Sequence, residues 1–192
     1  MCMEKVDTPH SNIEKVLPTE IERKFIISPS SLEEIKGSLP LIEKRKITQA
    51  YLEITDEREV RIRKTEKNSQ VSYECTVKTK LDDDKNGLVR GEVTEVITAE
   101  EFDEAMQKHI GNVINKTRLA FALDGNTLEV DVYQGDLKGL LSAEIEFNST
   151  EASEKFETPA WLDLDHEVTY RKDFKNQQLA LHGIPQDYLS LD

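Results

Sequence analysis

A short row of charged residues near the start of the chain has the spacing of a metal and phosphate site. Glu20, Glu22 and Lys24 occupy every second position, so on a β-strand their side chains share one face, while Ile21 and Phe25 point to the other. Two carboxylates supply oxygen ligands for a hard divalent cation, and an ammonium group binds an anionic oxygen. The solvent face of an ordinary antiparallel strand looks the same, so the meaning of this row depends on whether other strands repeat it.

Six later segments repeat the alternation of charged and apolar side chains. The basic positions, with the first row included, are Lys24, Arg61, Arg63, Lys78, Arg90, Lys116 and Arg118. The acidic positions are Glu20, Glu22, Glu92, Glu129, Asp131, Glu144 and Glu146. Basic residues concentrate in the middle segments and carboxylates in the first and last, whereas a solvated face scatters the two signs. Unpaired buried charge is costly, so we expect a cation and a polyphosphate to complete this arrangement.

The surrounding sequence predicts antiparallel strands with helices outside them. After the first row, strands are expected at residues 43–54, 58–66, 70–80, 87–97, 112–123, 127–134 and 140–148. Residues 124–126, with the sequence Asp-Gly-Asn, predict a hairpin turn. Capping patterns at Ser30 or Ser31 and at Thr98 predict two short helices, and further helices are expected around 151–156 and 175–182.

Closure of these strands into a barrel would bring the first strand beside the last. Glu20 and Glu22 would then meet Glu144 and Glu146. Converging carboxylates repel one another unless a cation lies among them. The sequence therefore predicts a metal site where these two strands meet.

Composition narrows the classes of function. The 192 residues fit one domain, expected at 18–185 between an arm at 1–17 and a tail at 186–192. A net charge of −13 argues against DNA binding through the outer surface. No apolar run resembles a membrane span or a signal peptide, and the two cysteines, Cys2 and Cys75, make no disulfide framework. We therefore expect a reduced, cytoplasmic protein with no membrane partner, and leave a homodimer open.

The ordered rows resemble the CYTH family, also called the triphosphate tunnel metalloenzymes. Its ExExK, RxR, TxK, KxR and ExEF motifs match, in chain order, Glu20–Lys24, Arg61–Arg63, Thr76–Lys78, Lys116–Arg118 and Glu144–Phe147. ExExK alone is a weak signal in a glutamate-rich chain, whereas the ordered set is specific. The resemblance extends from about residue 19 to 182.

This resemblance implies a mainly β, α+β fold: a closed barrel of eight antiparallel strands around a charged tunnel, with helices packed outside. A triphosphate would bind along the tunnel with Mg²⁺ or Mn²⁺. The implied metal ligands, which form the catalytic set together with Lys24, are Glu20, Glu22, Glu144 and Glu146. The implied phosphate ligands are Lys24, Arg61, Arg63, Lys78, Arg90, Lys116 and Arg118. The supporting residues would be Glu92, Glu129 and Asp131.

The resemblance to the CYTH family leaves several activities open. The leading hypothesis is metal-dependent hydrolysis of inorganic triphosphate, a small molecule, with release of phosphate. The alternative is a class IV adenylyl cyclase that forms cyclic AMP and pyrophosphate from ATP, although the His-Phe pair that can precede ExExK in such cyclases is absent from residues 12–17. A thiamine triphosphatase would need an aromatic platform, and the one tryptophan, Trp161, falls in the irregular tail. The non-enzymatic alternative is a polyphosphate- or nucleotide-binding module.

Overall fold

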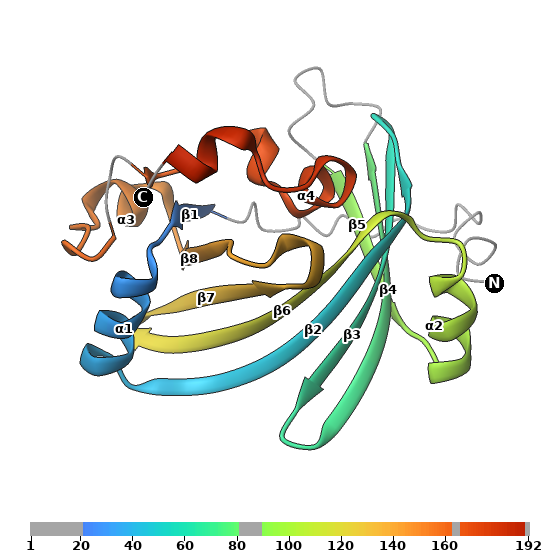
Figure 1. The fold of residues 1–192 in the computed structure, drawn as a ribbon, viewed down its shortest axis with the longest axis horizontal. Coiled ribbons are helices and arrows are strands. Elements are labelled where there is room, and N and C mark those ends of the chain that lie inside the picture. Colours follow the sequence, from blue (N-terminus) through green and yellow to red (C-terminus); the bar gives the residue numbers. More distant parts are fainter. Residues whose placement is uncertain (1–20, 81–89, 163–165, 191–192) are drawn as a thin grey trace.

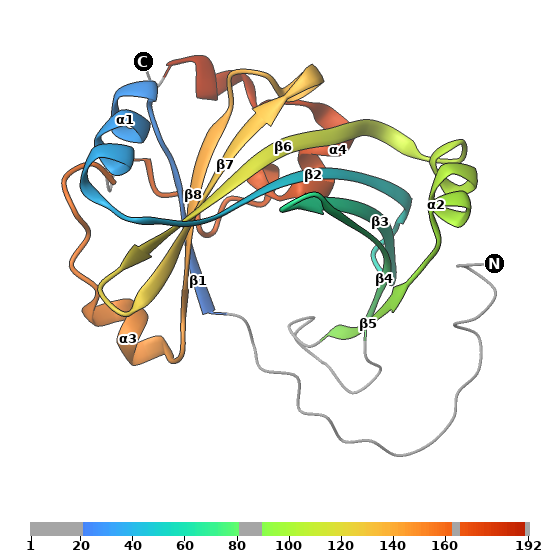
Figure 2. The ribbon, with the colours of Figure 1, turned by 90° about the horizontal axis from the view of Figure 1, so that it is seen from below.

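All eight strands belong to one strongly curved antiparallel sheet (Figures 1 and 2). The structure is a computed structural model that describes residues 21–80, 90–162 and 166–190. The strands are β1 (Ile21–Ile26), β2 (Leu41–Ile54), β3 (Arg58–Lys67), β4 (Gln70–Lys80), β5 (Arg90–Val96), β6 (Ile110–Leu123), β7 (Asn126–Gln134) and β8 (Leu141–Phe147). Their spatial order is β1-β8-β7-β6-β2-β3-β4-β5. The mainly β, α+β architecture is as predicted.

The prediction of a closed barrel is not confirmed. The first and last strands do pair, with Glu22 opposite Glu146, but this pair lies within the sheet. The ends of the sheet are β1 and β5, and no pairing joins them within the described residues (Figure 2). One physical reason lies at the outer edge of β1, where the main chain of Lys24 is bonded to Val168 and Thr169 instead of to another strand.

Helices cover the convex face of the sheet. Helix α1 (Pro29–Ser38) begins after Ser28, whose hydroxyl accepts a hydrogen bond from the Ser31 amide at 3.1 Å, so the cap lies two residues before the predicted Ser30. Its buried Leu32 and Ile35 pack on apolar side chains of β1, β6, β7 and β8. Helix α2 (Ala99–Met106) has the predicted Thr98 capping box and packs against β3 and β4. These contacts leave the charged rows predicted from the sequence on the concave side of the sheet.

The last part of the chain, from Val168 onward, covers one end of the concave face (Figure 1). It contains α4 (Asn176–His182) and the short 3-10 turns η3 (Lys172–Phe174) and η4 (Gln186–Ser190). The preceding helix α3 (Thr150–Lys155) is followed by Phe156, which packs with Phe147 in the core beneath α1. Phe174, Leu179 and Ala180 pack against the concave-face residues Tyr51 and Ile114. This apolar cluster therefore replaces charged side chains at that end of the sheet.

The position of Cys75 and the lengths of the helices bear on two further expectations. Cys75 is buried beneath α2, as expected of a packing residue. No helix within the described residues has the length and apolar composition needed to cross a membrane.

Candidate functional site

The concave face brings together charged residues that are far apart in the sequence. Register partners on neighbouring antiparallel strands lie directly beside each other. Glu22 on β1 is opposite Glu146 on β8, and Lys24 is opposite Glu144. On the other side of β8, Glu144 is opposite Glu129, and on β6 and β7 Arg118 is opposite Asp131. The predicted charged rows therefore form one surface.

Arg118 is the centre of the most buried part of this surface. Its Nε and Nη2 atoms donate hydrogen bonds to the two carboxylate oxygens of Asp131, both at 2.7 Å. Nη2 also donates to Glu144 at 2.9 Å, and Nη1 pairs with Glu129. Lys116 donates to Asp131 at 2.6 Å. Asp131 is thus a counter-ion shared by Lys116 and Arg118.

Burial and neighbouring charges oppose each other in this network. Burial alone would raise the pKa of Asp131, but Lys116 and Arg118 outweigh it and hold that pKa well below its usual value. Burial would also raise the pKa of Glu144, and Lys24 with its neighbouring cations lowers it. For Lys116, burial is the largest effect and lowers its pKa to about 8, although Asp131 acts in the opposite direction. Both carboxylates are therefore ionised at neutral pH.

The β1–β8 pair leads from this buried network out to solvent. Lys24 Nζ lies 2.9 Å from Glu144 Oε1, and the two side chains are only 10% and 14% exposed. Glu22 and Glu146, the next pair towards the open ends of the strands, are exposed. Glu20 would extend this row, but it lies outside the described residues. Two solvated carboxylates thus stand beside a largely buried ammonium group.

A second group of cations lies on β3 and β4. Lys78 forms an ion pair with Glu92 at 2.8 Å, and Arg61 lies 3.6 Å from the same carboxylate. Burial lowers the pKa of Arg63, and the nearby charges of Arg61 and Arg118 lower it further. The strand position of Arg90 is described, at the start of β5, but its side chain is not. Positive charges on opposite parts of the curved sheet are therefore close enough to repel one another.

A further row of polar side chains, which the sequence did not predict, lies on β2. Gln49 is fully buried, accepts hydrogen bonds from Arg63 at 3.0 and 3.2 Å, and donates one to the Tyr51 hydroxyl at 2.9 Å. Further along the strand, Arg45 pairs with Glu43 and lies 3.7 Å from Glu129. The sequence contains one indication of this row: these residues occupy alternate positions of the strand and therefore share a face. They connect the β3 cations to the Arg118 network.

Carboxylates at the open end of the face are the candidates to hold a metal ion. Among the described residues, no three His, Cys, Asp or Glu side chains are grouped closely enough to make a metal cluster by themselves. Mg²⁺, however, is usually held by one or two carboxylates together with substrate phosphates and water. The facing residues Glu22 and Glu146 fit that requirement, with Glu144 beside them on β8.

Comparison with known proteins places this fold and its charged face in one family. The CYTH domain model matches residues 18–170, so the chain belongs to the CYTH domain family, as the resemblance indicated. Within the family, the chain is 34% identical over 165 residues to an inorganic triphosphatase of Nitrosomonas europaea, across 85% of this chain and 97% of that protein. It is 30% identical over 163 residues to an inorganic triphosphatase of Acetivibrio thermocellus, across 84% and 92% of the two chains.

The fold similarity agrees with the sequence similarity. A crystal structure of an inorganic triphosphatase matches this structure with a TM-score of 0.61 at 33% identity. The match covers 87% of this chain and 97% of that one. The similarity therefore extends over most of the chain and is not confined to one motif.

Proposed function

We propose that this protein is a divalent-metal-dependent hydrolase of inorganic triphosphate. The main support for this proposal is a hydrogen-bond donor of Arg61 that is left unsatisfied within the described part of the chain. Its Nε atom is buried and has no hydrogen-bond partner among the described residues, and it belongs to the face that also holds Arg63 and Lys78. A buried donor without a partner is costly. An oxygen of a bound phosphate chain would satisfy it, and the similarity to two inorganic triphosphatases supports the same substrate.

The cations of the concave face would bind the substrate. A triphosphate carries its negative charge along an extended chain of oxygens, and cations on several strands can contact it at several points. The proposed ligands are Lys24, Arg61, Arg63, Lys78, Arg90, Lys116 and Arg118. The counter-ions Asp131, Glu129 and Glu92 would keep these side chains in place before substrate arrives, which lowers the cost of ordering them on binding.

Mg²⁺ or Mn²⁺ is the proposed cofactor. Glu22, Glu144 and Glu146 would hold the ion, with Glu20 as a fourth ligand from the same row as Glu22. Oxygen ligands of this kind suit hard divalent cations. When bound, the ion would neutralise phosphate charge and polarise the phosphorus–oxygen bonds.

The hydrolytic step needs a positioned water more than a strong protein nucleophile. We assign the positioning of water to Glu146, because Glu144 is already engaged by Lys24 and Arg118. The water oxygen would bond to a terminal phosphorus as the bridging phosphorus–oxygen bond breaks. The bond electrons leave with pyrophosphate, and the water proton passes through the carboxylate to solvent. Phosphate and pyrophosphate are the products.

The test is a panel of substrates and metals with the purified protein. Inorganic triphosphate, ATP and thiamine triphosphate are each supplied with Mg²⁺, with Mn²⁺ or with a chelator, and phosphate, pyrophosphate and cyclic AMP are measured. We expect fastest phosphate release from inorganic triphosphate, and none with the chelator. Cyclic AMP and pyrophosphate as the main products would establish the cyclase instead. Tight triphosphate binding without any product would establish a binding module.

A further inference from the structure

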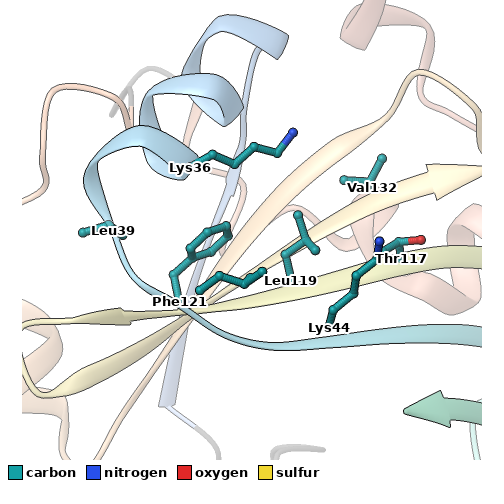
Figure 3. A pocket seen from close by; sticks show the side chains of 8 residues that line it. Lys36, Leu39, Lys44, Thr117, Leu119, Phe121 and Val132 are labelled. Carbon is teal, nitrogen blue, oxygen red and sulfur yellow. The ribbon is translucent and has the colours of Figure 1, made fainter. Parts of the chain in front are cut away.

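A hollow lies on the convex side of the sheet, away from the charged face (Figure 3). It has a volume of about 490 Å³ and is bordered by the end of α1 and by β2, β6 and β7. Its size is within the range of roughly 300–1,000 Å³ that is typical of small-molecule sites. The concave site uses none of the residues that line it.

The lining of this hollow combines an apolar floor with a cationic rim. The floor includes Leu119 and Val132 from the sheet, with the buried Phe121 beneath them, and the rim includes Lys36 from α1 and Lys44 from β2 (Figure 3). Within the described part of the chain, no carboxylate belongs to the lining. A locally basic hollow is unusual on a chain whose net charge is −13, and it favours an anionic ligand.

Both lysines can turn towards a ligand. Lys36 pairs with Glu33 at 2.8 Å, but the two side chains are 43% and 72% exposed, and exposed pairs of this kind contribute little to stability. Lys44 is exposed and has no ion-pair partner among the described residues. Beside them, Leu41 is 53% exposed, which leaves apolar surface in contact with water at the edge of the hollow.

We propose that this hollow is a second ligand site that binds a free amphipathic carboxylate. The apolar body of the ligand lies over Leu119 and Val132 and against Leu41, and its carboxylate lies between Lys36 and Lys44. A small inorganic anion would leave the apolar floor unused, and a neutral apolar molecule would leave the cations unused. Only a molecule with both parts complements the whole lining.

The two ligand surfaces are back to back on the same strands. On β6, Thr117 and Leu119 of the hollow alternate with Lys116 and Arg118 of the concave face. Because successive side chains of a strand point to opposite faces, a ligand in the hollow lies directly behind the phosphate-binding face. Triphosphate, which has no apolar part, should therefore not compete for the hollow.

Isothermal titration calorimetry with decanoate tests the proposal. We expect saturable binding of one decanoate per chain, weaker binding of the neutral analogue decanol, and no displacement of decanoate by triphosphate. A Lys36→Ala, Lys44→Ala double variant should bind decanoate about tenfold more weakly, because it loses two charge contacts. Lys46→Ala is the matched control: Lys46 is exposed on the same face of β2 but does not line the hollow, so its affinity should be unchanged.

Several results would overturn the proposal. They are the absence of saturable decanoate binding, equal affinity for decanol and decanoate, displacement by triphosphate, or unchanged affinity in the double variant with its circular dichroism spectrum intact. Binding to vesicles of anionic lipid without binding of free decanoate would also overturn it, since it would identify a membrane surface as the partner.

Discussion

The backbone amide of Lys24 donates a hydrogen bond to the side-chain oxygen of Thr169 at 3.0 Å. The Thr169 hydroxyl in turn donates to Glu167 at 2.6 Å, and Glu167 forms an ion pair with Arg23 at 2.7 Å. The Val168 amide donates to the Lys24 carbonyl at 2.8 Å. The strand that carries Lys24 is therefore held by β8 on one side and by the C-terminal segment on the other.

Thr169→Val should lower both stability and activity. The substitution keeps the shape of the side chain but removes an acceptor for Lys24 and a donor to Glu167, so we expect a loss of about 1–2 kcal/mol in the free energy of unfolding. Because Lys24 would be less well fixed, kcat for triphosphate should fall as well. Urea unfolding and phosphate release measure the two effects. Thr169→Ser retains the hydroxyl and should restore both, and unchanged values for the valine variant would contradict this role.

Glu22→Gln should abolish metal-dependent phosphate release without unfolding the protein. The amide is nearly the same size as the carboxylate and the side chain is exposed, but it loses the negative charge that attracts a divalent cation. Activity is measured against Mg²⁺ and Mn²⁺ concentration. Glu104→Gln, an equally conservative change on the exposed surface of α2, is the control and should behave as wild type. Full activity of the Glu22 variant would remove Glu22 from the metal site.

Asp131→Asn should be strongly destabilising. Asp131 is 1% exposed and pairs with both Lys116 and Arg118. The asparagine variant leaves the buried Lys116 without its ion-pair partner among the described residues, whereas Arg118 keeps Glu129 and Glu144. The expected cost is about 3–5 kcal/mol in urea unfolding. Asp136→Asn, an exposed change in the turn η1 (Gly135–Leu137), serves as the control and should have little effect. A loss as small as that of the control would show that the network is solvated.

The same carboxylate gives a prediction for acid. The pKa of Asp131 is lower in the folded protein than its ordinary value of 3.8, because Lys116 and Arg118 outweigh burial. The stability that it contributes is therefore complete above about pH 4 and is lost as the pH falls further. The difference in unfolding free energy between wild type and Asp131→Asn should be constant from pH 7 to about pH 5 and shrink below about pH 4. A difference that stays constant to pH 3 would contradict the shift.

Gly111→Ala should loosen the C-terminal segment. Gly111 has a φ of +66°, and a Cβ atom there would lie 2.4 Å from the carbonyl oxygen of Ala180 in α4. Backbone strain and this clash should cost at least about 1–2 kcal/mol and increase hydrogen exchange in α4. Gly37→Ala is the control, because a Cβ atom on that helical glycine meets nothing within 4 Å and should stabilise α1 by about 0.5–1 kcal/mol. Equal stability of the two variants would contradict the close contact.

The sequence predicted the strands well where one face of the strand is packed. The 124–126 turn forms as expected, with positive φ angles of 45° at Asp124 and 82° at Gly125. On β6, β7 and β8, apolar side chains pack beneath α1, so the charged positions stand out by alternation. On β2 the convex positions Lys44 and Lys46 are exposed. Charges then occur on both faces of β2, and the row that contains Gln49 was hidden.

Long-range contacts were beyond sequence reasoning. The sequence predicted that β1 and β8 lie side by side, because their carboxylates were expected to meet. It did not predict that β1 and β5 would be the edge strands of the sheet. β1 is an edge strand because its outer side bonds to Val168 and Thr169, about 145 residues further along the chain. The partners of Arg118 likewise depend on register across β6, β7 and β8. Parity predicts the face on which a side chain lies, and register decides which charge it meets.

The alternation along β6 also limits how this protein can change length during evolution. A one-residue insertion beside Lys116 would turn every later side chain to the opposite face. Arg118 would then face the apolar layer beneath α1, and Leu119 would face the substrate. The hairpin at Asp124 and Gly125 has no such constraint, since an extra residue there leaves the strands in register. We therefore expect related sequences to vary in length at this hairpin and to keep the length of β6 constant.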